Sequence, residues 1–390
     1  MPEPILRLTW TDPETGRHGY AVVDTLVGGV AAGGTRLRAG VSLAEVERLA
    51  HAMSLKNGSL GIPSGGAKLG VDADPSEPDA QAILTRFVRH LKPLFETMLV
   101  TGEDMGTTPA LLASVFRDAG IDSSLHAGLV RSGDPAAALA RVAQGLTIEE
   151  EGVALVDLVG GFGVAEAALA AVEHLGLGEA AGLRASIQGF GSMGGSSARY
   201  LARAGVRVVA IADVHGTVSN PNGLDVEQLL RARSAGGDID RSSLGAGDVQ
   251  AGTDAWLGAE AEILVPAAVA DAIDEANCDR VRARLVVEAA NIPTTSAAER
   301  RLRERDVTVV PDFIANAGTN AYLWWLVLGE IEPTVASSFE AIGRTMRAAV
   351  PAALRLAAEQ GRSPRDAAAE LALARLAEMA RTSEPAAARV

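Results

Sequence analysis

The second half of the chain alternates short apolar segments with segments of helical length, and this alternation constrains the fold more than any other feature. The apolar segments begin at about residue 183 and are rich in Val, Ile and Leu. These candidate strands are residues 184–188, 206–213, 262–265, 284–288 and 307–311. Apolar strands joined by helices are typical of a parallel sheet with helices on both faces. We therefore expect a doubly wound α/β domain here.

A glycine-rich turn, GFGSMG, follows the first of these strands and opens a helical pattern. The next strand ends at Asp213, 19 residues after Gly194. In a dinucleotide-binding unit such glycines let backbone N–H groups approach the pyrophosphate at a helix N-terminus, and the acidic residue binds the ribose hydroxyls. Asp213 and the absence of Arg or Lys over residues 214–220 favour NAD over NADP. The residues expected to hold the cofactor in this turn are Gly189, Gly191, Ser192, Met193 and Gly194.

At 390 residues the chain exceeds the size at which a single core stops growing, so we expect two domains. The expected layout is an N-terminal α/β domain over residues 1–150, followed by a Rossmann NAD-binding domain over residues 151–325 and by C-terminal helices over residues 326–390.

The net charge of −14 argues against a nucleic-acid partner and against binding to anionic membranes. A single cysteine, Cys278, excludes an internal disulfide framework and suits a reducing compartment. The N-terminus has no basic and apolar leader pattern, and no uncharged apolar run is long enough to span a bilayer. We therefore expect a cytoplasmic protein. The six histidines show no metal-binding spacing, so no metal site is expected.

The N-terminal half begins its helical pattern at Ser42, which forms a capping box with Glu45. We expect this helix to cover residues 42–57 and to be broken by the glycines that start at Gly58. Short strand-like segments surround it at residues 19–24, 69–74 and 97–102. Residues 120–160 are expected to connect the two domains.

Lysine is rare in this chain, which holds only Lys56, Lys68 and Lys92 against 32 arginines. Lys56 and Lys68 are separated by twelve residues and flank a glycine cluster. A desolvated lysine can lose its proton and act as a base, whereas an arginine stays protonated. Taken alone, however, the count is equally compatible with interchangeable surface charges.

The order of the motifs resembles the amino-acid dehydrogenase superfamily that includes the glutamate, leucine, phenylalanine and valine dehydrogenases. In the first half the resemblance rests on GGTRLRAG (33–40), MSLKNG (53–58), IPSGGAKLGV (62–71) and TGEDMGTT (101–108). It continues through GTVSNPNGLD (216–225), ILVPAAV (263–269), VVEAANIPTT (286–295) and VVPDFIANAG (309–318). The N-terminal layout is closest to the leucine, phenylalanine and valine enzymes.

The resemblance implies roles for individual residues. Lys56 matches the lysine that holds the substrate α-carboxylate, Lys68 the catalytic lysine, and Asp104 its acidic proton-transfer partner. The remaining matches are Gly33 and Gly34 beside the substrate, and Ala267, Ala268 and Asn291 around the nicotinamide ribose. The resemblance also implies that residues 1–150 form the substrate-binding and oligomerisation domain and that the helices of residues 326–390 pack back toward it. It implies an active site in the cleft between the two domains, and a homo-oligomer, a dimer or larger.

The implied reaction is NAD-dependent oxidative deamination of an L-amino acid to the 2-oxo acid and ammonia, or the reverse. It needs a base that works near neutral pH, and a lysine with a lowered pKa suits this role. Two alternatives stay open: an imine reductase of a biosynthetic pathway on the same scaffold, and a non-catalytic NAD-binding regulator.

One position departs from the glutamate enzymes. They carry a lysine before the Gly-Gly pair to hold the side-chain carboxylate, and this chain has Ala32 there. A second carboxylate without a partner in a closed site costs several kcal/mol. We therefore expect L-glutamate to be a poor substrate, with Ala32 and Tyr322 or Trp324 shaping a pocket for a neutral side chain.

Overall fold

A computed structural model describes residues 3–234 and 236–383 of the chain. The chain divides into two compact units. The first contains residues 1–141, 327–330 and the chain from Ala369 onward, and the second contains residues 142–326 and 331–368. Each unit is built around its own sheet.

The sheet of the first unit has five strands in the order β1-β2-β4-β3-β5. The strands are β1 (Leu6–Thr11), β2 (His18–Val23), β3 (Ala31–Leu37), β4 (Gly65–Val71) and β5 (Leu99–Glu103). Strands β3, β4 and β5 are mutually parallel, whereas β1 and β2 are antiparallel to their neighbours. Three parallel strands side by side bring their carboxyl ends to one edge of the sheet.

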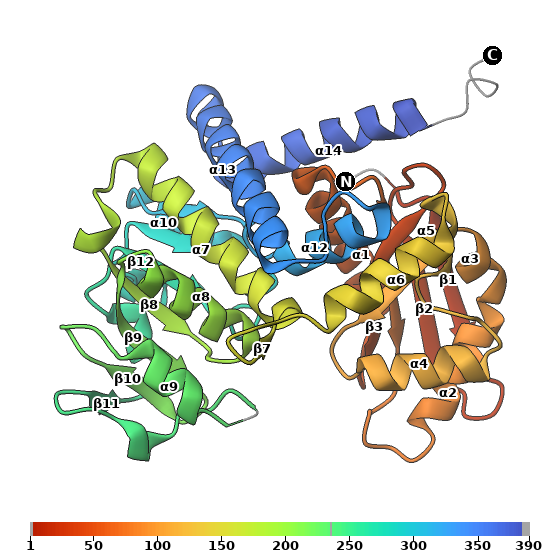
Figure 1. The fold of residues 1–390 in the computed structure, drawn as a ribbon, viewed down its shortest axis with the longest axis horizontal. Coiled ribbons are helices and arrows are strands. Elements are labelled where there is room, and N and C mark those ends of the chain that lie inside the picture. Colours follow the sequence, from red (N-terminus) through yellow and green to blue (C-terminus); the bar gives the residue numbers. More distant parts are fainter. Residues whose placement is uncertain (1–2, 235, 384–390) are drawn as a thin grey trace. The chain divides into compact units, whose positions relative to one another are not determined.

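Helices cover both faces of this sheet (Figure 1). Helix α1 (Leu43–Leu60) lies on one face, where Gly66 and Gly70 let its backbone and side chains come close to β4. The other face carries the main core of the unit, in which Leu69 packs with Phe87 and Val115. Four further helices follow α1 between residues 80 and 131, namely α2 (Ala80–His90), α3 (Lys92–Thr97), α4 (Pro109–Asp118) and α5 (His126–Arg131).

Helix α1 runs further than predicted. It begins after the N-cap Ser42, as the capping box indicates, but it continues through Gly58 and ends at Gly61 in the left-handed conformation. A Cβ at Gly58 would lie 2.2 Å from the carbonyl oxygen of Ala372 in helix α14 (Pro364–Ser383). Gly58 therefore permits two backbones to approach within the helix, and the prediction that it breaks the helix was wrong.

The second unit holds a seven-stranded sheet in the order β11-β10-β9-β8-β12-β13-β14. The strands are β8 (Arg184–Gln188), β9 (Arg207–Asp213), β10 (Gly216–Ser219), β11 (Val249–Ala251), β12 (Ile263–Pro266), β13 (Leu285–Val287) and β14 (Thr308–Val310). The five strands β9, β8, β12, β13 and β14 are parallel, and β10 and β11 form an antiparallel edge. Strand order reverses between β8 and β12, which is where doubly wound sheets bind ligands. The predicted α/β fold with a Rossmann-type domain is confirmed.

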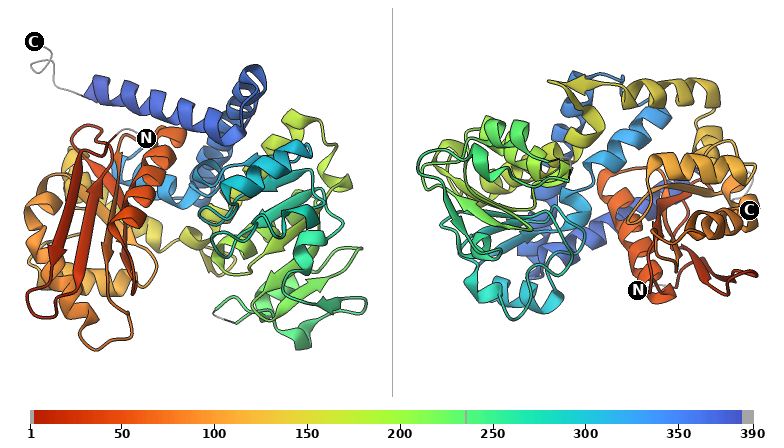
Figure 2. Two further views of the ribbon diagram at one scale, coloured as in Figure 1. Left: turned by 180° about the vertical axis from the view of Figure 1, so that it is seen from behind. Right: turned by 90° about the horizontal axis from the view of Figure 1, so that it is seen from below.

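Helices pack on both faces of this second sheet, as Figure 1 and the view from behind in Figure 2 show. Helices α7 (Leu155–Leu175) and α8 (Ser192–Arg203) contact each other on one face, and α10 (Ser296–Glu304) lies on the other with Trp256 and Leu264 in its core. By length and composition alone α7 is apolar enough to span a membrane, but 72% of its most apolar window is buried. Burial of this kind is what a core helix of a globular domain shows.

The segment predicted to connect the domains contains regular structure. It includes α6 (Pro135–Leu146) and a short hairpin of β6 (Glu149–Glu150) and β7 (Val153–Ala154). The other helices of the second unit are α9 (Val226–Ala232), α11 (Asp312–Ala315), α12 (Gly318–Leu328) and α13 (Val335–Gln360). The helical C-terminal region was expected from its sequence, and Gly361 in the left-handed conformation ends α13 before α14 begins.

Candidate active site

Lys68 and Asp104 form an ion pair within the first unit. The Lys68 Nζ lies 3.0 Å from Asp104 Oδ2, and the two side chains are 8% and 15% exposed. The backbone N–H of Asp104 donates to the hydroxyl of Thr107, which in turn donates to the Thr35 carbonyl. Asp104 is therefore fixed to the neighbouring strand β3 rather than left on a free loop.

The register of the parallel strands explains why these side chains meet. Arg36 on β3 pairs with Gly70 on β4, so that Lys68, two residues earlier, lies on the same face of the sheet. Thr35 pairs with Glu103 on β5, which places the next residues, Arg36 and Asp104, side by side. The register thus brings Arg36 on β3, Lys68 on β4 and Asp104, the residue directly after β5, to one face near the carboxyl ends of the three strands.

Gly33 and Gly34 create the space for this pair. A Cβ on Gly33 would lie 1.7 Å from the Ala67 carbonyl oxygen. A Cβ on Gly34 would lie 2.9 Å from the Cβ of Asp104 and 3.0 Å from the Nζ of Lys68. The two glycines are therefore required by the packing of the site itself, and their contact with a substrate stays a prediction.

Arg36 is part of this site, although the sequence did not identify it as a partner of Asp104. Its Nε donates to Asp104 Oδ2 at 2.8 Å, and its Nη1 donates to Glu45 at 2.7 Å. Burial alone would raise the pKa of Asp104, but the charges and hydrogen bonds of Lys68 and Arg36 lower it to about 2. Burial lowers the pKa of Lys68; Asp104 opposes this effect and Arg36 adds to it. The site thus pairs a firmly ionised carboxylate with a lysine that loses its proton more readily than usual.

The other predicted substrate residues lie in the same unit. Lys56 is in the last turns of α1, and the side chain of the adjacent Asn57 donates to the carbonyl of Gly65 at 2.8 Å, at the start of β4. Ala32 is buried on β3, two residues before Gly34 and therefore on the same face. By contrast, Tyr322 is fully buried in the second unit, where its hydroxyl donates to the Gly145 carbonyl. This contact gives Tyr322 a core role.

In the second unit, the glycine-rich turn adopts the predicted strand–turn–helix geometry. Gly189 follows β8 with φ of 90°, and Gly191 precedes α8 as its N-cap. A Cβ on Gly194 would lie 2.1 Å from the Gly189 carbonyl oxygen, so that only glycine allows the helix to start so close to the strand. Ser192 and Met193 form the first residues of α8. The N–H groups of this turn are suited to bind a phosphate.

The loops after β12 and β13 lie beside this turn. The Ala267 N–H donates to the Gln188 carbonyl, and a Cβ on Gly189 would lie 3.0 Å from that of Ala268. The side chain of Asn316 donates to Asn291 Oδ1 at 3.1 Å. The predicted cofactor residues of the second unit therefore gather at the carboxyl ends of β8, β12 and β13, although their contact with a cofactor stays a prediction.

A buried charge cluster supports the Asn291 loop. We call it the Arg365 cluster, and it consists of Arg365, Glu288, Glu299 and Asp312. Arg365 donates to Glu299 at 2.6 Å, to Asp312 at 3.0 Å and to Glu288 at 2.5 Å. Asp312 also accepts the N–H of Ile292, whose φ of 49° is unusual for a β-branched residue. The cluster therefore holds a strained turn directly after Asn291.

Asp213 lies at the end of β9, as predicted, but its carboxylate is already engaged. Arg241 forms a two-pronged ion pair with it, and the N–H groups of Ile239 and His215 donate to it at 2.8 and 2.9 Å. Burial would raise the pKa of Asp213, but these hydrogen bonds lower it. Arg241 lies 28 residues further along the chain. The residues directly after β9 therefore gave no indication that Arg241 pairs with Asp213.

Comparison with known proteins identifies the family. The first part of the chain, residues 7–119, matches the model of the Glu/Leu/Phe/Val dehydrogenase dimerisation domain, and residues 152–383 match that of the glutamate/leucine/phenylalanine/valine dehydrogenases. The chain belongs to the Glu/Leu/Phe/Val dehydrogenase family. The resemblance predicted from the motifs is thus confirmed, and the chain is an amino-acid dehydrogenase, a class that uses a pyridine nucleotide.

Three known proteins show how similar the chain is to others in sequence and in fold. The chain is 36% identical over 317 residues to an NADP(+)-dependent glutamate dehydrogenase of Pyrobaculum calidifontis, covering 79% of this chain and 72% of the relative. A hetero-hexameric glutamate dehydrogenase of Thermus thermophilus superposes with a TM-score of 0.75 and 29% identity, over 98% of this chain and 90% of that chain. An L-tryptophan dehydrogenase of Nostoc punctiforme shares the fold, with a TM-score of 0.68, 18% identity and 96% of each chain covered.

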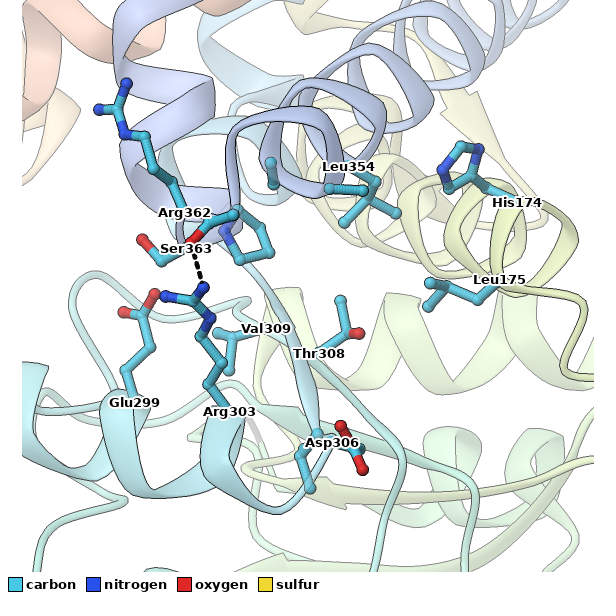
Figure 3. A pocket seen from close by; sticks show the side chains of 15 residues that line it. His174, Leu175, Glu299, Arg303, Asp306, Thr308, Val309, Leu354, Arg362 and Ser363 are labelled. Carbon is cyan, nitrogen blue, oxygen red and sulfur yellow. Dashed lines mark hydrogen bonds between the residues drawn. The ribbon is translucent and has the colours of Figure 1, made fainter.

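A separate pocket of about 330 Å³ lies in the second unit, between α10 and the end of α13 (Figure 3). Arg303 donates there to the carbonyl of Gly361, and Glu299 of the Arg365 cluster also lines it. The pocket contains none of the residues that the family resemblance implies for catalysis or cofactor binding.

Proposed function

We propose that the chain catalyses NAD-dependent oxidative deamination of an L-amino acid with a neutral side chain, or the reverse reductive amination. The observation that carries this proposal is the buried contact of Lys68 with Asp104 at 3.0 Å, beside Gly34. A lysine with a lowered pKa can take up and release a proton near neutral pH, which an arginine in the same place cannot.

The roles of the residues follow from their charges. Lys56 is assigned to the α-carboxylate of the substrate. A bound nicotinamide nucleotide would accept the hydride that leaves Cα. Asp104 takes the proton that the substrate ammonium must lose before hydride transfer, and it stabilises the iminium cation. Lys68 takes a proton from the water that attacks the iminium carbon and gives it to the nitrogen of the resulting carbinolamine. The C–N bond then breaks as the carbinolamine hydroxyl loses its proton and the C=O bond forms, so that ammonia leaves with that proton as ammonium. In reductive amination the same groups return these protons.

The second unit fits a dinucleotide. The close contact between Gly194 and the Gly189 carbonyl brings the start of α8 to the end of β8. No atom lies within 4 Å of a Cβ built on Gly191, so the turn has open space where a pyrophosphate binds. Gly191 has no side chain to cap the helix, which leaves the N–H groups of Ser192 and Met193 available for phosphate oxygens.

The proposed preference for neutral side chains rests on the surroundings of Ala32. Arg36 and Arg38 are the nearby cations that could pair with a second carboxylate, and both donate to Glu45. Arg36 also holds Asp104. A substrate carboxylate near Ala32 would therefore have to displace one of these ion pairs. The names of the relatives do not favour this restriction, because they include glutamate dehydrogenases.

A panel of 2-oxo acids tests the reaction and the substrate together. We expect NADH oxidation that requires both ammonia and the 2-oxo acid, with kcat/KM for 2-oxoisocaproate, phenylpyruvate or indolepyruvate at least tenfold above that for 2-oxoglutarate. Turnover with an imine in the absence of ammonia would instead indicate an imine reductase. A preference for 2-oxoglutarate would reject the interpretation of Ala32 and leave the deamination reaction intact.

The proposal of NAD as cofactor rests on Asp213. Its ionised carboxylate repels the 2′-phosphate of NADP. Both terminal nitrogens of Arg241 donate to Asp213, and they also donate to the carbonyls of Ile239 and Gly216, so binding a phosphate would require Arg241 to leave these partners. One relative is named NADP(+)-dependent, so the comparisons do not favour NAD. The ratio of kcat/KM for the two cofactors tests this part of the proposal.

We also infer that the protein works as a cytoplasmic homo-oligomer. The first unit matches a family domain described as a dimerisation domain, and a structural relative is described as hetero-hexameric. Light scattering of the purified chain would test the inference, and a monomer at micromolar concentration would contradict it.

A further inference from the structure

Arg36 connects the two reacting groups of the proposed site to a third charge. Its Nε contacts the same oxygen, Asp104 Oδ2, that faces Lys68 Nζ, at 2.8 and 3.0 Å respectively. The opposite side of the guanidinium contacts Glu45 in the first turn of α1. The Arg36 side chain is only 12% exposed, so these contacts are poorly screened by water.

The position of Arg36 is fixed from both sides. Strand β3 places it between β4, which carries Lys68, and β5, which leads to Asp104. Helix α1 supplies Glu45, which also binds Arg38. Burial tends to raise the pKa of Glu45, but Arg38 and Arg36 together lower it. Glu45 therefore stays ionised and holds the guanidinium against the edge of Asp104.

We propose that Arg36 is a positioning residue that holds Asp104 ionised and at the same time favours the neutral form of Lys68. The inference rests on the proposed function of Lys68 as a base. Without Arg36, Asp104 would pair with Lys68 alone, and an isolated buried carboxylate stabilises the ammonium form of its partner. With Arg36 present, one oxygen of Asp104 is shared between two cations, and the permanently charged guanidinium repels the ammonium.

The charges around Lys68 agree with this assignment. Asp104 and Glu45 favour the charged lysine, whereas burial and Arg36 favour the neutral one. On the same side of the sheet, Asp24 and His51 contact each other at 3.2 Å. The net direction is a lowered pKa for Lys68. Arg36 is a cation that acts in this direction.

The scarcity of lysine makes a direct test feasible. Trace acetylation with acetic anhydride modifies only unprotonated amines, and mass spectrometry separates the peptides of Lys56, Lys68 and Lys92. The yield at each pH gives a titration midpoint for every lysine without any turnover. Lys92, whose side chain is 39% exposed, serves as the internal reference. In the wild-type chain we expect the midpoint of Lys68 below that of Lys92.

Arg36→Gln removes the charge but keeps a hydrogen-bonding group. We expect the midpoint of Lys68 to rise by about one pH unit or more. The low-pH limb of kcat/KM for deamination should shift upward by the same amount. Arg38→Gln is the matched control, because Arg38 shares Glu45 but has no contact with Asp104 among those described. It should leave both values unchanged, and Arg36→Lys should restore most of the wild-type midpoint.

An unchanged Lys68 midpoint in a folded Arg36→Gln variant would overturn the proposal, as would an equal shift in Arg38→Gln. If Arg36→Gln does not fold, Glu45→Gln provides the test with the opposite sign. Removing this negative charge should lower the Lys68 midpoint, and a raised or unchanged midpoint would again reject the assignment. Because acetylation needs no substrate, a chain without any ammonia-dependent turnover would contradict the proposed function alone.

Discussion

Replacing Arg365 by Met should destabilise the second unit strongly, because Arg365 is the cation that pairs with three buried carboxylates. The side chains of Glu288, Asp312 and Glu299 are 0%, 4% and 9% exposed, and each accepts a hydrogen bond from Arg365. Each charge-assisted hydrogen bond contributes about 1.5–3 kcal/mol, and removing one partner of a buried ion pair costs about 3–5 kcal/mol. Glu288 relieves part of this cost by taking up a proton. We therefore expect a loss of about 3–5 kcal/mol at pH 8.

The pH dependence of the stability loss distinguishes the loss of the ion pairs of Arg365 from a loss of packing. The pKa of Glu288 is raised to about 7, because burial and the charges of Asp312 and Glu299 together outweigh the opposing effect of Arg365. Without Arg365 the Glu288 carboxyl group should hold its proton to still higher pH. The variant therefore recovers stability as the pH falls, and at pH 5.5 we expect a loss of about 2 kcal/mol or less.

The single cysteine gives a reporter for this unit. Cys278 is fully buried in the core beneath α10, and its thiol can react with a disulfide reagent only when the unit opens. A loss of 3 kcal/mol corresponds to about a hundredfold faster labelling under native conditions. Arg301→Met is the matched control. Arg301 lies on α10, the helix that carries Glu299, and it pairs with an exposed carboxylate, Asp279. Such a surface pair contributes about 0–1 kcal/mol.

Two results would refute this reasoning. The first is a Cys278 labelling rate in Arg365→Met within tenfold of the wild-type rate at pH 8. The second is an equal increase of the labelling rate at pH 8 and at pH 5.5, because a loss of stability caused by unpaired carboxylates must depend on pH.

The remaining predictions concern the candidate catalytic residues, the choice of cofactor, and the stability of the second unit below pH 7. Lys68→Arg should abolish turnover while NADH binding, followed by fluorescence, persists, and Asp104→Asn should lower kcat by about 10²-fold or more. Asp213→Ser should release Arg241 and shift kcat/KM toward NADP by about tenfold or more, and the added change Arg241→Ser should cancel that gain. Because the folded pKa of Glu288 is raised, the second unit binds an extra proton when folded. Its wild-type stability should therefore fall as the pH rises from about 4.5 to about 7, and Glu288→Gln should remove that dependence.

Local patterns predicted the elements that depend on neighbours in the chain. The capping box located the start of α1, and the G-x-G-x-x-G turn located the junction of β8 and α8, because each signal lies within a few residues of the structure that it specifies. The continuation of α1 through Gly58 was missed because the reason for that glycine, the backbone of Ala372, lies more than three hundred residues away.

The site was predictable only in part for the same reason. Family motifs pointed to Lys68 and Asp104, which the sheet brings together. The arginines that pair with the predicted acidic residues were not recognised. Arg36 is 68 residues away from Asp104 in the sequence, and Arg241 is 28 residues away from Asp213. Spacing along a chain indicates which residues share a helix or a strand. It does not indicate which of 32 arginines will neutralise a given carboxylate.

The contact between Gly58 and α14 has a consequence for how the protein is made. The first unit is assembled from residues near both ends of the chain, and Arg375 donates to the Ser59 carbonyl at 3.0 Å beside that contact. On the ribosome, α1 emerges early and must wait for the whole second unit to be translated before α14 can cover it. A nascent chain that stops near residue 330 therefore presents an uncovered helix face to chaperones. The domain that begins the chain is the last to be completed.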